Sequence, residues 1–265
     1  HKPFWVIADH LARNGIATLR YDDRGVGGSD ALGLATATTE TFKGDALAMV
    51  NYLKENGMKN IGVIGHSEGG LIAFMLGAEV EYLNFVVSLA GTAVSGDQIL
   101  IEQNRVLLEK SEVPTEIVNS YCELLKEIYA IKRSNTQFNR ESKITELRNK
   151  YSNLPLQMTG NIAALLQPQA WIDYFISYDP TEALKNIGCR VLALNGDKDV
   201  QVIAKQNIDA LKQHIPAEQL TTKIYPDLNH LFQHCTTGMP NEYYQIEETI
   251  SPEVLKDIIN WIKKQ

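Results

Sequence analysis

Stretches with a helical repeat of apolar residues alternate along most of this chain with short stretches that are rich in apolar or β-branched residues. Phe4, Ile7 and Leu11 recur at intervals of three or four residues, and Asn14-Gly15 follows them, which predicts an amphipathic helix that ends there. The strands predicted from the apolar runs are residues 16–21, 61–64, 85–90, 190–194 and 221–225, and further helices are predicted at 42–53, 71–78 and 252–261. This alternation favours an α/β fold with a mostly parallel sheet and helices on both faces.

One long segment departs from the alternation. No strand pattern is present between residues 91 and 190, but Ile117, Tyr121, Leu124 and Ile128 form a helical stripe. A segment of this length is too long for a loop without secondary structure. We therefore expect a core made of residues 1–91 and 188–265, with residues 92–187 inserted as a helical lid over the carboxyl ends of the strands. An independent helical domain is the alternative.

Composition and charge narrow the classes of function. The chain has 265 residues, of which 44% are hydrophobic, and its 25 Lys and Arg against 32 Asp and Glu give a net charge of −7. No basic cluster is present, so we expect no binding to nucleic acid. No apolar run approaches the ~20 residues that a membrane-spanning helix needs. We expect a soluble protein, cytoplasmic or exported, of unknown oligomeric state.

The cysteines and histidines do not suggest a metal site. Cys122, Cys189 and Cys235 are isolated from one another, without the paired spacing of a zinc or redox site. The six histidines show no close helical spacing with an acidic partner. We therefore expect structural thiols, no metal and no cofactor.

The candidate chemistry begins with the segment Gly65-His66-Ser67-Glu68-Gly69, which matches Gly-x-Ser-x-Gly. It lies directly between a predicted strand and a predicted helix, where a sharp turn lifts the serine hydroxyl above the sheet. A serine becomes a good nucleophile only when a base accepts its proton and an acid orients that base. An acid and a histidine indeed follow the last two predicted strands: Asp197 and Asp199 after the first of these, and His230 after the second.

These motifs resemble the α/β-hydrolase superfamily over nearly the whole chain, with the greatest similarity to bacterial carboxylesterases and the serine-aminopeptidase-like group. Besides the Ser67 turn, the resemblance rests on the loop at residues 21–29 (YDDRGVGGS) and on Tyr178-Asp179-Pro180. It implies that Ser67 is the nucleophile, that His230 is the general base and then the acid, and that Asp199 is the orienting carboxylate. Asp197 is the alternative acid.

The same resemblance implies further roles around this triad. The backbone N–H of Glu68, which follows the nucleophile, is expected to donate to the oxyanion. The side chains of His66 and Glu68 are expected to support the turn. Trp171 and Phe175, among the aromatic residues of the expected lid, are candidates for substrate binding.

The expected activity is hydrolysis of small-molecule acyl esters, as in carboxylesterases of class EC 3.1.1. A serine peptidase or amidase of the same fold is one alternative, and a non-catalytic binding protein on the hydrolase scaffold is the other. The family also has three strands before the helix that matches residues 4–11, and the loop after the third of these strands supplies a second oxyanion donor. We therefore expect the native protein to extend upstream of His1, with those N-terminal strands missing from this chain.

Overall fold

The computed structural model describes residues 2–134 and 138–265, which divide into two compact units. The first unit comprises His1–Val94 and Asp179–Gln265, and the second comprises Ser95–Tyr178. The first unit contains α1 (Pro3–Arg13), η1 (Leu34–Thr36), α2 (Thr39–Glu55), β1 (Ile61–His66), α3 (Glu68–Glu79), β2 (Leu83–Leu89), α10 (Thr181–Lys185), β3 (Arg190–Gly196), α11 (Ala204–His214), β4 (Leu220–Tyr225), η2 (Pro240–Gln245) and α12 (Pro252–Ile262).

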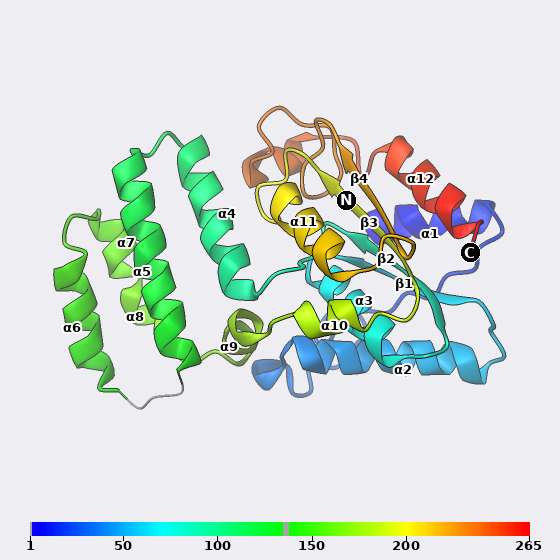
Figure 1. Cartoon of the computed structure of the whole chain (residues 1–265), viewed down its shortest axis with the longest axis horizontal. Coiled ribbons are helices and arrows are strands. Elements are labelled where there is room, and N and C mark those ends of the chain that lie inside the picture. The colour runs from blue at the N-terminus through cyan, green and yellow to red at the C-terminus, as the bar shows by residue number, and fades with distance from the viewer. Residues whose placement is uncertain (1, 135–137) are drawn as a thin grey trace. The chain divides into compact units, whose positions relative to one another are not determined.

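The described part of the first unit contains one four-stranded sheet of order β1-β2-β3-β4 (Figure 1). Each neighbouring pair is parallel, and Val86 lies opposite Val191 in the register between β2 and β3. Parallel strands bring their carboxyl ends to one edge of the sheet. The turns that carry Ser67, Asp199 and His230 follow β1, β3 and β4, so they all lie at this edge.

Helices cover both faces of the sheet because successive side chains of a strand point to opposite faces. On one face, Phe85, Val87 and Leu89 of β2 are buried together with residues of α1 and α12. On the other face, Val86 is buried with residues of α3, α10 and α11. The predicted α/β class is confirmed, and the strands predicted at 61–64, 85–90, 190–194 and 221–225 are confirmed as β1 to β4.

The second unit is helical. It contains α4 (Gly96–Lys110), α5 (Thr115–Arg133), α6 (Arg140–Lys150), α7 (Leu156–Gly160), α8 (Ile162–Leu165) and α9 (Ala170–Ser177). The predicted stripe lies on α5, where Leu124, Leu125 and Ile128 are at most 1% exposed within an apolar core of this unit. The unit therefore has a hydrophobic core of its own, and its role as a lid stays a prediction.

The sequence interpretation was wrong about residues 16–21. They form no strand: the segment runs without regular hydrogen bonding, and most of its side chains are exposed, including Leu19 at 40% and Tyr21 at 44%. A strand needs a neighbouring strand to bond its backbone groups, and none of the described residues lies beside this segment in a sheet. The interpretation also missed α11, whose buried face includes Ile208 and Leu211.

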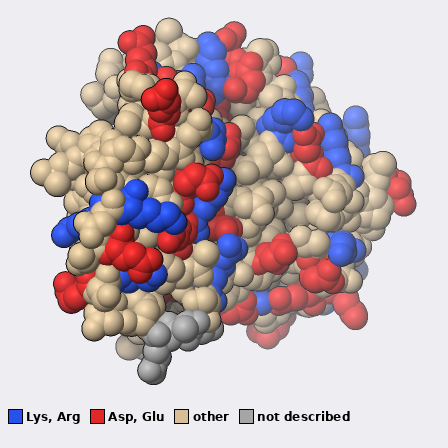
Figure 2. Space-filling view, turned by 60° about the vertical axis from the view of Figure 1, so that its left-hand side comes forward, with Lys and Arg blue, Asp and Glu red and all other residues tan. Residues whose placement is uncertain are grey.

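The charged side chains are mixed over the face of the molecule shown in Figure 2. Acidic and basic groups are interspersed there, and no large area of this face is only positive. Among the helices described, none combines the length and the apolar character required to cross a bilayer. In residues 2–134 and 138–265, no group of three or more His, Cys, Asp and Glu is arranged to hold a metal ion.

Candidate active site

Ser67 lies on a sharp turn between β1 and α3. Its backbone has φ 56° and ψ −120°, a conformation that residues other than glycine rarely adopt. The flanking glycines make the turn possible, because a Cβ on Gly65 would lie 1.9 Å from the carbonyl oxygen of Gly69. A Cβ on Gly70 would lie 2.6 Å from the Cα of Gly91, in the loop after β2. The Gly-x-Ser-x-Gly-Gly sequence thus allows α3 to begin directly against the sheet.

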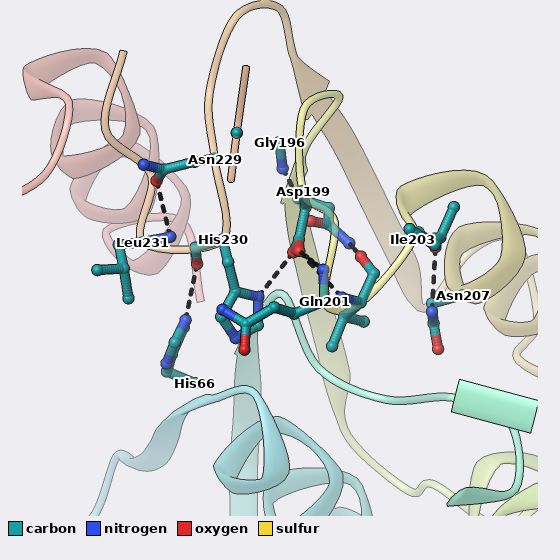
Figure 3. Close-up of polar contacts among 12 residues, drawn as sticks. His66, Gly196, Asp199, Gln201, Ile203, Asn207, Asn229, His230 and Leu231 are labelled. Atoms are coloured by element: carbon teal, nitrogen blue, oxygen red, sulfur yellow. Dashed lines mark hydrogen bonds and ion pairs between the residues drawn. The ribbon is translucent and has the colours of Figure 1, made fainter. Parts of the chain in front are cut away.

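Asp199 lies in the turn after β3 and is 4% exposed. Its Oδ1 accepts the backbone N–H groups of Gln201 at 2.8 Å and Val202 at 2.9 Å. Its Oδ2 lies 2.8 Å from Nδ1 of His230 (Figure 3). Both oxygens are therefore held, and the carboxylate has one orientation toward the imidazole.

The neighbouring acids make other contacts. Asp197 is exposed, and its Oδ1 accepts the backbone N–H of Asp227 at 2.7 Å. Asp227 forms an ion pair with Lys198 at 2.7 Å. The hydrogen bond from Lys198, and then its positive charge, hold the pKa of Asp227 below its ordinary value. Of the two candidate acids, Asp199 and Asp197, the structure brings Asp199 to His230.

His230 lies in a loop after β4 that is fixed by buried amides. Asn229 and Gln233 are both 0% exposed. Oδ1 of Asn229 accepts the backbone N–H groups of Leu231 at 2.9 Å and Gln233 at 3.0 Å, and Nδ2 of Asn229 donates to Oε1 of Gln233 at 3.0 Å. The side chain of Gln233 in turn donates to the carbonyl of Glu248 at 2.8 Å. Buried amide pairs of this kind give a loop one conformation.

Sequence reasoning missed Asn229 and Gln233, although one signal was available. Asn side chains often bond the backbone two residues further on, and an Asn directly before His230 is such a case. Asn195, near the end of β3, supports the turn that carries Asp199, because its Nδ2 donates to the carbonyl of Val202 at 3.0 Å. These amides support the backbone on both sides of the Asp199–His230 pair.

The β1 turn and the His230 loop meet through His66, the residue before Ser67. Nε2 of His66 lies 2.8 Å from the carbonyl oxygen of His230, and the two ring centroids are 4.5 Å apart (Figure 3). Burial, and the neighbouring His230, lower the pKa of His66 to about 4. The hydrogen bonds of the described residues do not include one between Ser67 Oγ and the His230 ring. The Ser67 turn and the His230 loop are therefore linked at this edge through His66, the last residue of β1.

The remaining predicted residues lie in two places. Glu68 is the first residue of α3, and its carboxylate accepts the hydroxyl of Thr39 at 2.7 Å. Its side chain thus joins α3 to α2, as a supporting role requires. Trp171 and Phe175 belong to α9 of the second unit, where their rings stack with centroids 5.4 Å apart. Phe175 is buried and Trp171 is 36% exposed.

Comparison with known proteins agrees with this architecture. Residues 4–234 match the family model described as serine aminopeptidase, S33. Similar solved structures include proline iminopeptidase from Mycobacterium smegmatis (TM-score 0.56, 14% identity, covering 99% of this chain and 86% of that one). An esterase from Pyrococcus furiosus is similar at TM-score 0.53 and 15% identity, covering 99% of this chain and 74% of that one. At such identities these structures support the fold alone.

A curated relative is an acyl transferase of Photobacterium leiognathi, 25% identical over 114 residues. That match covers 42% of this chain and 36% of the acyl transferase, so it spans about a third of the relative's length. The family match, by contrast, covers most of the chain, including the turns that carry Ser67, Asp199 and His230. The chain therefore belongs to the serine aminopeptidase S33 family of α/β-hydrolases.

Proposed function

We propose that this hydrolase-family chain is a serine hydrolase that cleaves carboxylic esters of small molecules, a carboxylesterase of class EC 3.1.1. The observation that carries the proposal is the buried contact of 2.8 Å between Asp199 Oδ2 and His230 Nδ1, at the sheet edge that also holds the Ser67 turn. An imidazole held by a carboxylate near a serine on a strained turn is the arrangement that nucleophilic catalysis requires.

The proposed reaction proceeds through an acyl-enzyme. Ser67 Oγ attacks the ester carbonyl carbon, and its proton moves to Nε2 of His230, while Asp199 accepts the Nδ1–H and keeps that tautomer. The Glu68 amide, at the N-terminus of α3, donates to the oxyanion. The tetrahedral intermediate then expels the alcohol, which takes the proton from Nε2. Water attacks the acyl group, gives a proton to Nε2 and releases the acid as that proton returns to Ser67.

Hydrolysis of peptide or amide bonds is the second candidate, and the family description favours it. The same groups cleave an amide when Nε2 of His230 protonates the leaving amine. The acyl transferase relative suggests a third outcome, in which an acceptor other than water takes the acyl group. Rates on a p-nitrophenyl ester and on an aminoacyl p-nitroanilide separate the first two. Product partitioning with added alcohol measures the third.

We also propose that Trp171 and Phe175 contact the acyl group of the substrate. The support is that they form an aromatic pair on α9, with one ring partly exposed. Small-molecule sites are lined mainly by hydrophobic and aromatic side chains such as these.

The deciding experiment is Ser67→Ala, with Ser111→Ala as the control. Ser111 is exposed, and its hydroxyl donates to the carbonyl of Leu107 at 2.8 Å. Replacing Ser111 therefore removes a serine hydroxyl that donates to Leu107 and not to Ser67, Asp199 or His230. We expect Ser67→Ala to lose ~10³-fold or more of p-nitrophenyl acetate hydrolysis, and all fluorophosphonate labelling, with unfolding unchanged. Ser111→Ala should match the wild type.

Two results would contradict the proposal. Equal labelling of the wild type and of Ser67→Ala would mean that another group reacts with the probe. A folded wild type that neither labels nor hydrolyses any ester or amide would favour the non-catalytic binding protein.

A further inference from the structure

His66 combines two contacts with His230 that no catalytic step described above uses. Its Nε2 lies 2.8 Å from the His230 carbonyl oxygen, and its ring packs on the His230 ring at 4.5 Å between centroids with a tilt of 50°. The backbone of His66 belongs to β1, and Ser67 follows it directly. One side chain thus joins the strand before the serine to the loop of the histidine (Figure 3).

The chemistry of this contact specifies the state of His66. A carbonyl oxygen only accepts hydrogen bonds, so Nε2 of His66 must carry the hydrogen. Burial and the nearby His230 lower the pKa of His66 to about 4, although the bond to the carbonyl and the charge of Asp199 act in the opposite direction. His66 is therefore a neutral donor at any pH well above that value, and it places no positive charge beside the ring of His230.

The ring of His230, the backbone that follows it and its carbonyl oxygen are each held by a different residue. Asp199 holds the ring through Nδ1, and Asn229 holds the backbone that follows through Leu231 and Gln233. These contacts orient His230 relative to β3 and to its own loop. The contact from His66 relates His230 to β1, the strand that ends at Ser67.

We propose that His66 is a positioning residue, which holds the backbone carbonyl and the ring face of His230 against the turn that carries Ser67. This inference rests on the proposed function, since it matters only if Nε2 of His230 must reach the Ser67 hydroxyl. A hydrogen-bond donor at the place of His66 Nε2 is the property that the role requires.

The test compares His66→Gln with His66→Asn. Both side chains end in an amide donor, but the nitrogen of Gln extends to about the place of Nε2, whereas the nitrogen of Asn stops near the place of Nδ1. His66→Phe keeps a ring and removes the donor. For each variant we measure the rate of fluorophosphonate labelling at Ser67, kcat and KM on p-nitrophenyl acetate, thermal unfolding, and the ¹H and ¹⁵N resonances of the His230 Nδ1–H group.

We expect His66→Asn and His66→Phe to lower the labelling rate and kcat about tenfold, the factor that corresponds to one hydrogen bond of ~1.4 kcal/mol, with KM little changed. The His230 Nδ1–H resonance should shift in both variants, because the bond to Asp199 is no longer held in one geometry. His66→Gln should keep the wild-type resonance and stay within about threefold of the wild-type rate.

The proposal is overturned if His66→Gln is as impaired as His66→Asn, because a donor at this place would then not be what matters. It is also overturned if His66→Asn and His66→Phe unfold at lower temperature but keep the wild-type rate and His230 resonance. Failure of the proposed function looks different: the wild type itself would not label at Ser67, while the resonances of His230 would still report the effect of each His66 variant.

Discussion

Replacing Asp199 by Asn tests the orientation of His230 most directly. Oδ1 of Asp199 accepts two backbone N–H groups, and Oδ2 faces Nδ1 of His230 at 2.8 Å. In Asp199→Asn the amide oxygen can still accept the two backbone groups, which leaves the NH₂ group toward His230. Because NH₂ donates, Nδ1 must then accept, and the imidazole hydrogen moves to Nε2. An Nε2–H cannot take the proton of Ser67.

The magnitude follows from this change of tautomer. We expect kcat/KM on p-nitrophenyl acetate to fall on the order of 10⁴-fold, which is ~5.4 kcal/mol of transition-state stabilisation. The free energy of unfolding should change little, because the two backbone N–H groups keep an acceptor. Asp199→Ala removes that acceptor, and each buried N–H left unpaired costs ~1–3 kcal/mol. The two variants therefore separate the chemical role from the structural one.

The matched control is Asp197→Asn. Asp197 lies two residues earlier in the same turn, is exposed, and accepts one backbone N–H, that of Asp227. It should keep wild-type activity within about threefold. The assay is initial rate against substrate concentration, with urea unfolding of the same samples. The reasoning is refuted if Asp199→Asn keeps more than about a tenth of kcat/KM, or if Asp197→Asn loses as much as Asp199→Asn.

Two further predictions concern the second unit and the C-terminal helix. Trp171→Ala should change the preference among acyl chain lengths by ~1–3 kcal/mol while acetyl ester turnover stays, and an unchanged chain-length profile would remove Trp171 from the substrate site. Phe175→Ala loses a buried ring and should also lower the free energy of unfolding by ~3–5 kcal/mol. Burial raises the pKa of Asp257, but hydrogen bonds from Lys223 and Tyr225 outweigh it, so its pKa lies below the ordinary value. Asp257 therefore stabilises the fold above its unfolded-state pKa, and this stabilisation is lost as pH falls through the lowered value. In urea unfolding, Asp257→Asn should lower the free energy of unfolding at pH 7 and lower it less at pH 3. An equal decrease in the free energy of unfolding at the two pH values would contradict this prediction.

Much of the fold was predictable from the sequence because the patterns involved are local. The helical repeat of α1 predicts a buried face, and Ile7 and Leu11 are indeed buried there, although Phe4 of the same repeat is 42% exposed. The apolar runs that became β1 and β2 are short and each follows a predicted helix, as parallel strands do. Gly65 likewise predicts a sharp turn, since a Cβ there would meet Gly69, only four positions away. The need for glycine at Gly70 is different, because it arises from Gly91 in the loop after β2.

Other features depend on partners that are distant in the chain. Residues 16–21 are apolar enough for a strand, but a strand forms only when another strand bonds it, and this segment has none beside it in the described chain. The apolar pattern reports how a segment would be buried. It carries no information about the neighbour that must accept its backbone hydrogen bonds.

The candidate active site also combines residues that the sequence indicates with contacts that only the fold specifies. Asp197 and Asp199 are both acids in one turn, and residue type alone leaves either as the partner of His230. The tertiary structure distinguishes them, because backbone N–H groups hold the Asp199 carboxylate inward while Asp197 faces solvent. The contact between His66 and His230 joins residues 164 positions apart. The sequence by itself determined which groups could react, and only the folded chain decided which of them meet, because a hydrogen bond depends on distances of about 3 Å that sequence spacing does not specify.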